Sequence, residues 1–212
     1  MVRICWALFG VVLCGSLYAR GAVAINPAKA EHDAKATDHY TEGTRLAERG
    51  DHAGAIKEFR EAARLEPRWV EVRNDLGVEL YLTGDAPAAL EQLRIAAELG
   101  PERGAVRVNL AFALYDVGQT DEAVSAWREA LERGARVADA YAGLALGLYK
   151  QGDVEEALRM YRIAIDRDKS YAEVERLGPG GAGWSPHAVA DAAVLLRALQ
   201  NSTTAGSTPA SK

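Results

Sequence analysis

The chain repeats itself with a step of 34 residues. Four columns of residues keep this step: Gly50, Gly84, Gly118 and Gly152; Ala55, Ala89, Ala123 and Ala157; Ala62, Ala96, Ala130 and Ala164; and the bulky Phe59, Leu93, Trp127 and Tyr161. A fixed step of this size indicates stacked copies of one supersecondary unit, each too small to bury its own apolar face. The repeat therefore constrains the fold far more tightly than the function.

Each unit reads as a helical hairpin. In the second unit, apolar residues fall three or four apart in two runs, Leu76 to Tyr81 and Ala89 to Ala97. Gly84 lies between the runs, where a left-handed helix end costs glycine nothing, and Asp85 after it can cap the next helix. Aspartate follows the glycine in the first and fourth units as well, whereas the third unit has Gln119, a poorer cap. Glycines at a constant spacing argue against one long amphipathic helix or a coiled coil.

The first two units resemble the tetratricopeptide repeat. That family's pattern is a small residue, a turn glycine, an alanine, a bulky residue, an alanine and a closing proline, matched here by Gly43, Gly50, Ala55, Phe59, Ala62 and Pro67, and by Gly77, Gly84, Ala89, Leu93, Ala96 and Pro101. The third and fourth units have Ala135 and Lys169 in place of the proline, so the turns that follow them are less well defined.

The resemblance covers residues 36–171 and implies an all-α solenoid of four hairpins, with repeats at 36–69, 70–103, 104–137 and 138–171. The family consists of interaction scaffolds with many partners. The resemblance thus implies a protein or peptide partner and says little about biochemical activity.

The N-terminus has the layout of a secretory signal peptide. Arg3 precedes an apolar run from Ile4 to Tyr18, and the small-x-small site Ala22-Val23-Ala24 follows. We expect residues 1–24 to be a signal peptide and 25–35 a linker, which predicts an exported protein, periplasmic or secreted. The alternative is an uncleaved membrane anchor, although the run is shorter than the roughly 20 apolar residues of a typical span.

Both cysteines, Cys5 and Cys14, lie inside this N-terminal segment. A chain cleaved after Ala24 would contain no thiol and no disulfide, and the helices would depend on packing alone. Cys14 could instead carry a lipid, although Val11-Val12-Leu13 before it places a large residue where such sites favour a small one. The chain would meet a membrane only if the segment is retained or lipidated.

Residues 172–200 are expected to form a linker and a capping helix. The glycine-rich run Gly178–Gly183 lacks the Lys-Ser/Thr of a phosphate-binding loop and is interpreted as a hinge. Ser185-Pro186 is a typical helix start, and the apolar face of the following helix would cover the open end of the stack. The alternative is a homo-oligomer or partner interface through residues 186–200. Residues 201–212 are expected to be disordered.

The resemblance also implies that the first helices of the hairpins line a concave groove. Three columns would face it: Tyr81, Tyr115 and Tyr149; Thr44, Val78, Phe112 and Leu146; and Tyr40, Asn74 and Val108 with Ala142. The tyrosines could contact an extended peptide or a partner helix, or they could pack between neighbouring first helices; the sequence leaves both interpretations open.

Acidic residues are expected to rim this groove. Glu48, Glu71, Asp116 and Asp139 are its predicted rim, with Lys150 as the exception. An apolar or basic peptide is therefore a better ligand than an acidic carboxyl terminus.

Several functional classes find no support. The formal charge is −5, or −7 without the signal segment and its Arg3 and Arg20, and no basic stripe is present, which disfavours nucleic acid. The histidines, His32, His39, His52 and His187, lack metal-ligand spacing. No nucleophile or metalloprotease motif occurs. We therefore expect a scaffold in cell-envelope assembly, with no catalytic residue, metal or cofactor, or else a structural protein that associates with itself.

Overall fold

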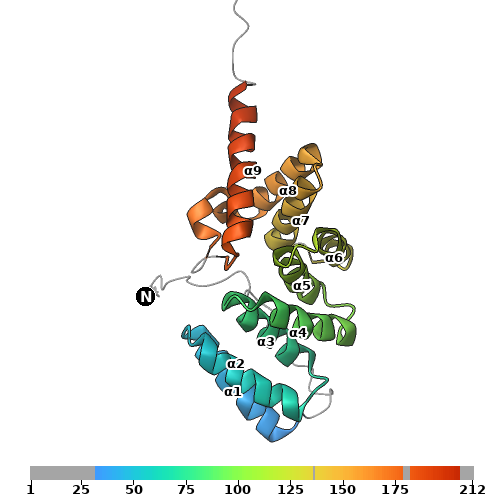
Figure 1. The fold of residues 1–212 in the computed structure, drawn as a ribbon, viewed down its shortest axis with the longest axis vertical. Coiled ribbons are helices and arrows are strands. Elements are labelled where there is room, and N and C mark those ends of the chain that lie inside the picture. The colour runs from blue at the N-terminus through green and yellow to red at the C-terminus, as the bar shows by residue number, and fades with distance from the viewer. Residues whose placement is uncertain (1–31, 136, 179–181, 206–212) are drawn as a thin grey trace, which may run out of the picture.

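The computed structural model describes residues 32–135, 137–178 and 182–205. The predicted signal peptide, most of the predicted linker 25–35 and residues 206–212 lie outside the described part. Within it, every regular element is a helix, as predicted (Figure 1).

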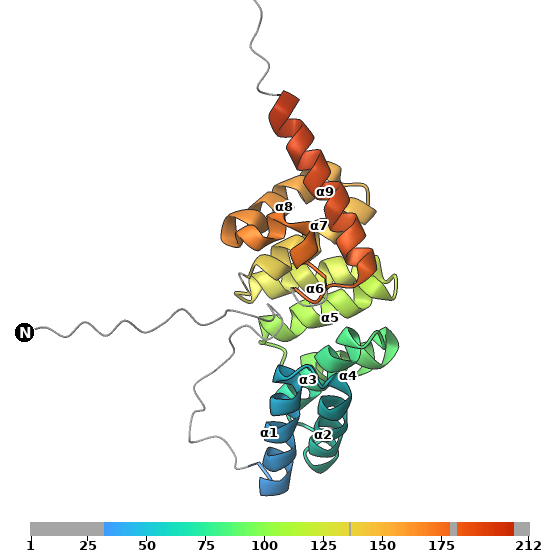
Figure 2. The ribbon, with the colours of Figure 1, turned by 90° about the vertical axis from the view of Figure 1, so that its left-hand side faces the viewer.

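Four hairpins follow one another along the chain: α1 (Ala34–Glu48) with α2 (His52–Leu65), α3 (Val70–Leu82) with α4 (Ala86–Leu99), α5 (Gly104–Asp116) with α6 (Thr120–Glu132), and α7 (Ala138–Lys150) with α8 (Val154–Arg167). Each hairpin packs on the next, so the molecule is elongated, with the first hairpin at one end (Figures 1 and 2). The predicted solenoid of four units is confirmed.

The turn inside each hairpin is built as the repeated glycine predicts. Gly50, Gly84, Gly118 and Gly152 have φ of 78°, 85°, 81° and 86°, the left-handed region that side chains disfavour. Asp51, Asp85 and Asp153 accept a hydrogen bond from a backbone N–H of the next helix at 3.0, 3.2 and 3.3 Å. The side chain of Gln119 caps nothing, as its chemistry predicts.

The bulky column fills the inside of the stack. Phe59, Leu93, Trp127 and Tyr161 are at most 1 % exposed, and both alanine columns are fully buried. A Cβ atom at Gly43 would lie 2.6 Å from the Phe59 ring, too close for any side chain. A Cβ atom at Gly77 would likewise lie 2.6 Å from Leu93, so in the first two units the bulky side chain rests directly on the backbone of the glycine opposite it.

The third turn between units replaces the missing proline with a glycine. Gly134 has φ of 86°, and the N–H of Ala135 donates to the carbonyl of Ala130 at 2.9 Å, closing α6 with a left-handed cap. The fourth hairpin is followed by two short 3₁₀ turns, η1 (Lys169–Ala172) and η2 (Val174–Arg176).

The last helix, α9 (Pro186–Ala205), corrects one predicted boundary. It begins where Ser185-Pro186 predicts but continues five residues into the segment expected to be disordered from residue 201. It contacts α7 and α8, as a cap of the last hairpin would (Figures 1 and 2). Among the described helices, none is long and apolar enough to cross a bilayer.

Candidate functional site

The first helices α1, α3, α5 and α7 carry all ten residues of the predicted groove, but these residues fall into two classes. Five are partly accessible: Tyr40, Thr44, Asn74, Tyr81 and Tyr149. Five are buried: Val78, Val108, Phe112, Tyr115 and Leu146. The accessible residues come mainly from the first two units, and the buried ones mainly from the last two.

A hydrogen-bonded ladder crosses one half of the predicted groove. We call this half, the α1–α3 side carrying Tyr40, Thr44, Asn74 and Tyr81, the open half. Tyr40 Oη donates to Asp75 Oδ2 at 2.9 Å, and Asn74 Nδ2 donates to Asp75 Oδ1 at 3.0 Å. Asn109 Nδ2 on α5 donates to Asn74 Oδ1 at 2.9 Å. Three successive first helices thus present polar groups whose positions are already set before any ligand arrives.

Asp75 is the acidic centre of this ladder and was missed in the sequence. Burial of its carboxyl group raises the pKa to about 6, although the hydrogen bonds from Tyr40 and Asn74 oppose the shift. A carboxylate that is poorly hydrated yet ionised at neutral pH favours the approach of a cation.

Two of the predicted rim residues, Glu48 and Glu71, are accessible in the open half, and one of them is neutralised. Glu71 pairs with Arg103 at 2.6 Å. Burial raises the pKa of Glu71, but the hydrogen bond and charge of Arg103, together with a backbone hydrogen bond and the nearby His32, bring it below its ordinary value. Glu48 is exposed at the end of α1. The open half therefore combines aromatic surface from Tyr40 and Tyr81 with carboxylate charge.

The other half of the predicted groove is occupied by the chain itself. We call residues 182–196, the stretch leading into α9 and its first turns, the C-terminal insert. Trp184 is 1 % exposed, and its ring centroid lies 5.2 Å from that of Phe112 and 5.6 Å from that of Tyr171. An aromatic side chain thus fills the place where the sequence predicted a partner to bind.

Asp191 of the insert binds the middle tyrosine of the column, Tyr115. It is 8 % exposed, and its carboxylate accepts from Tyr115 Oη at 2.5 Å and from Lys150 Nζ at 2.8 Å. Burial, followed by the bond to Asp191, raises the pKa of Tyr115, which keeps its hydroxyl protonated as the donor. His187 stacks on the Tyr115 ring, with centroids 5.1 Å apart.

Ser185 joins the insert to α5 and α3. Its Oγ donates to Asp116 Oδ1 at 2.6 Å, and its N–H donates to Tyr81 Oη at 3.3 Å. The same Oγ accepts from the N–H of Ala188 at 3.2 Å and so caps α9, as predicted. One residue both starts the last helix and anchors it in the groove.

These contacts correct three predictions. Tyr115 packs inside the protein and does not face a free groove, which decides the open question for the middle tyrosine. Val78, Val108, Phe112 and Leu146 are likewise buried, so no partner reaches them in this arrangement. Asp139 is not on the rim: it is buried and accepts from Tyr171 Oη, and burial raises its pKa.

The sequence contained one signal for the insert. Trp184 is a large apolar residue placed directly after a glycine-rich run and before a helix cap, and such a residue needs a site in which to be buried. Helical periodicity identifies the apolar face of α9 but not the surface that receives it. The position of the insert therefore could not be predicted from the periodicity of the sequence.

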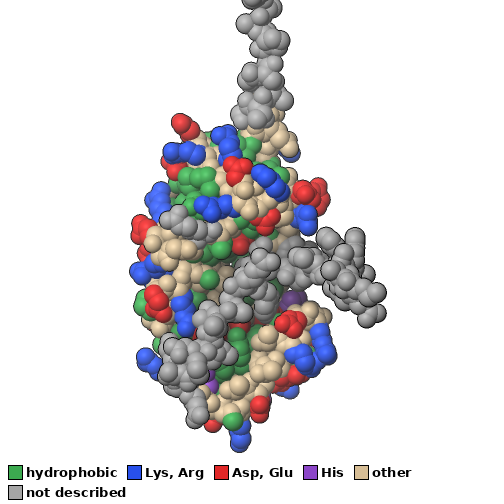
Figure 3. All heavy atoms as spheres, turned by 180° about the vertical axis from the view of Figure 1, so that it is seen from behind, with side chains coloured by type: hydrophobic (Ala, Val, Ile, Leu, Met, Phe, Trp, Pro, Cys, Tyr) green, Lys and Arg blue, Asp and Glu red, His purple; other side chains and the backbone are tan. Residues whose placement is uncertain are grey.

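Each histidine has a local contact. His39 and His52 lie 2.6 and 2.7 Å from carboxylate oxygens of Glu58 and Glu79, and His32 stacks on Trp69. Among the described residues, no group of three or more His, Cys, Asp or Glu is placed to hold a metal ion. Acidic and basic side chains are interspersed over the uncovered parts of the face in Figure 3.

Two family models match the chain, and both describe the tetratricopeptide repeat, one over residues 49–135 and the other over 108–173. No curated protein sequence matches significantly. Similar solved structures include MamA 41-end from Desulfovibrio magneticus RS-1, with 19% identity, a TM-score of 0.61, and 81% of this chain and 98% of that chain covered.

Two further structures are named for peptide binding. YrrB, described as a tetratricopeptide protein with an unusual peptide-binding site, has 26% identity and a TM-score of 0.57, with 63% of this chain and 69% of that chain covered. The first such domain of Spaghetti (RPAP3), bound to the HSP90 peptide SRMEEVD, has 14% identity and a TM-score of 0.54, with coverages of 56% and 94%.

Proposed function

Since the chain belongs to the tetratricopeptide-repeat family, we propose that it is a non-catalytic interaction scaffold that binds a peptide segment of a partner protein in the open half of its groove. The observation that carries the proposal is the fixed polar ladder from Tyr40 through Asp75 and Asn74 to Asn109. A set of donors and acceptors held in place by one another costs little entropy when a ligand binds.

The ladder also defines the chemistry of the ligand. Asp75 and the exposed Glu48 attract a basic side chain, while the rings of Tyr40 and Tyr81 offer apolar surface and can also stack on a guanidinium. A segment with an arginine or lysine next to an apolar residue fits this half best. An acidic peptide terminus is repelled.

The N-terminal sequence supports a location for this binding. Residues 1–24 have the layout of a signal peptide, so we place the scaffold outside the cytoplasm, in assembly of a cell-envelope complex. The anchored or lipidated form is the alternative, with the same groove held at a membrane.

Self-association through residues 186–200 is the second candidate function. The structure bears on it because Ala188, Ala192 and Leu195 of α9 are buried against the chain's own hairpins. A dimer would have to use the other face of α9, where Val194 is 42% exposed, or exchange the helix between copies. The open half makes peptide binding the better supported proposal.

Photo-cross-linking in native cells tests the function. A photoreactive residue at Thr44, inside the open half, is compared with one at Lys57, which is exposed on α2. We expect one partner to be captured from position 44 and not from 57, and mass spectrometry then identifies the cross-linked segment and the protein's own N-terminus. Capture from both positions, or only of a second copy of the chain, overturns the proposal.

The identified segment then allows a quantitative test. Asp75→Asn is expected to weaken binding of the synthetic segment about fivefold, the scale of one partly exposed charge pair. Asp38→Asn, an exposed aspartate on α1, is the matched control and should change little. Equal affinities for the two variants would show that the ladder does not contact the segment.

A further inference from the structure

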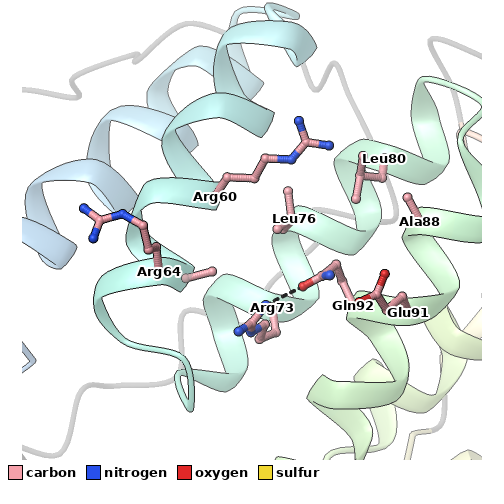
Figure 4. Close-up of a pocket in the computed structure, with 9 residues that line it drawn as sticks. Arg60, Arg64, Arg73, Leu76, Leu80, Ala88, Glu91 and Gln92 are labelled. Carbon is pink, nitrogen blue, oxygen red and sulfur yellow. Dashed lines mark hydrogen bonds between the residues drawn. The ribbon is translucent and has the colours of Figure 1, made fainter.

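A second concavity lies between α2, α3 and α4. It has a volume of about 390 Å³. Its lining includes three arginines (Arg60, Arg64 and Arg73) and one glutamate, Glu91, around a floor formed by Leu76 and Leu80 (Figure 4). In a chain whose formal charge is −5, such a concentration of positive charge is unusual.

Two of the three arginines of this pocket, Arg60 and Arg73, have no carboxylate partner in the described part of the chain. Arg73 donates to the carbonyl of Pro67 and to Gln92 Oε1, at 3.1 and 2.6 Å. Among the described residues, no carboxylate lies within 4.0 Å of a nitrogen of Arg60 or Arg73. Arg64 pairs only with Glu61 on its own helix, at 2.9 Å.

The repeat supplies an internal reference, because two of the three arginines recur 34 residues later at the next interface. Arg94 stands where Arg60 stands, and its Nη2 lies 3.0 Å from Glu122 Oε2. Arg107 stands where Arg73 stands, and its Nη1 lies 3.0 Å from Glu129 Oε2.

The registers of the two interfaces agree in detail. Arg107 also donates to the carbonyl of Pro101, just as Arg73 donates to that of Pro67. The two carboxylates are one difference, since the positions of Glu122 and Glu129 are held in the second unit by Ala88 and Ile95, and Arg64 is another, since Glu98 holds its position in the next unit. The pocket therefore presents arginines in the arrangement that binds two carboxylates one repeat further on.

We propose that the pocket formed by Arg60, Arg64 and Arg73 is a docking site for an acidic segment of a partner protein, whose carboxylates take the places that Glu122 and Glu129 occupy at the next interface. The charge of the pocket is complementary to such a segment, and guanidinium groups bind carboxylates through two parallel donors. Leu76 and Leu80 at the floor receive the methylene groups of the acidic side chains.

This site is separate from the groove and selects the opposite charge. The open half attracts basic groups through Asp75, whereas the pocket attracts acidic ones. The scaffold would thus hold two segments of different chemistry at once.

A binding experiment with paired substitutions tests the site. The probe is a short fluorescent alanine-rich helical peptide with two glutamates seven residues apart, the spacing of Glu122 and Glu129, and its counterpart has glutamine at both places. Fluorescence anisotropy with the full chain at low ionic strength should show binding of the glutamate peptide and about tenfold weaker binding of the glutamine peptide.

Ala88→Glu places a carboxylate inside the pocket and should weaken binding of the glutamate peptide about tenfold. Ala53→Glu adds the same charge at an exposed position of α2 and should leave it within twofold of the unsubstituted chain, roughly the scale of a screened surface charge. Glu122→Ala opens the equivalent place at the next interface and should add a second binding site.

Equal binding of the glutamate and glutamine peptides overturns the proposal, as does no binding of either. Equal effects of Ala88→Glu and Ala53→Glu also overturn it, because they would show that net charge alone controls binding. Asp75→Asn leaves the pocket intact, so the affinity for the glutamate peptide should not change. This variant therefore separates a failure of the pocket proposal from a failure of the proposed binding in the open half.

Discussion

The two halves of the groove are built from the same columns of the same repeat, yet one is open and the other is filled. In the open half, Tyr40, Asn74 and Tyr81 stay partly accessible, and Tyr40 and Asn74 are linked by hydrogen bonds through Asp75. In the filled half, Phe112 and Tyr115 are buried under Trp184 and Asp191. The difference teaches that a repeat specifies which residues can face a groove, and that a segment outside the repeat decides which of them do.

Replacing the central aromatic of the insert is expected to have the largest effect on stability. Trp184→Ala removes a fully buried ring from between Phe112 and Tyr171 and should lower the free energy of unfolding by about 3–5 kcal/mol. Urea titration followed by circular dichroism measures it. Thr44→Ala, in the open half, is the control and should cost less than about 0.5 kcal/mol. Similar losses at both sites would mean that the halves are equally packed.

The raised pKa of Asp75 in the open half should make the stability of the protein depend on pH. The folded pKa of Asp75 is about 6, above the ordinary value of 3.8 expected in the unfolded chain. The folded state therefore binds the proton more tightly, and the stability contributed by this group is greatest below about pH 4 and is lost as pH rises through 6.

Asp75→Asn removes that contribution. Its stability relative to the unsubstituted chain should improve by about 1–3 kcal/mol between pH 4 and pH 7, since each pKa unit is worth about 1.4 kcal/mol. Thermal or urea unfolding at several pH values measures the difference, with Asp38→Asn as the exposed control. A difference that stays constant with pH would show that the carboxyl of Asp75 is as well hydrated as an exposed one.

Matched removal of two tyrosine hydroxyls compares the halves directly. Tyr115→Phe leaves the buried carboxylate of Asp191 with one donor fewer and should cost about 1–3 kcal/mol. Tyr40→Phe affects Asp75, whose raised pKa lets it take up a proton more easily, and should cost about 1 kcal/mol or less. Equilibrium unfolding at neutral pH measures both, and a larger loss for Tyr40→Phe would reverse the comparison.

The smallest expected effect concerns the edge of the filled half. Lys150→Gln removes the 2.8 Å pair with Asp191, and because the lysine side chain is 35% exposed the loss should be about 0.5–1 kcal/mol and should shrink at high salt. Lys57→Gln, on the exposed face of α2, should change nothing measurable. An effect of Lys150→Gln that does not respond to salt would mean that the pair is more enclosed than its exposure suggests.

The sequence predicted the repeat architecture in detail because each element of it is local. Gly84 and Asp85 specify a turn within two residues, and the bulky column and the small residues opposite it lie within one hairpin or the next. The candidate site was predicted only in part. The partners of Tyr115 and Tyr81 in the insert are 76 and 104 residues away, and no periodicity connects such positions.

The link between Ser185 and Tyr81 has a consequence for cooperativity. In an open solenoid each unit touches only its neighbours, so unfolding can begin at either end and spread one unit at a time. Here the chain returns from its C-terminal end to α3, and the second, third and fourth hairpins are closed into a ring of contacts. The first hairpin stays outside that ring. Fraying should therefore be confined to one end of the molecule, with amide protons of α1 and α2 exchanging well before those of α5 and α7.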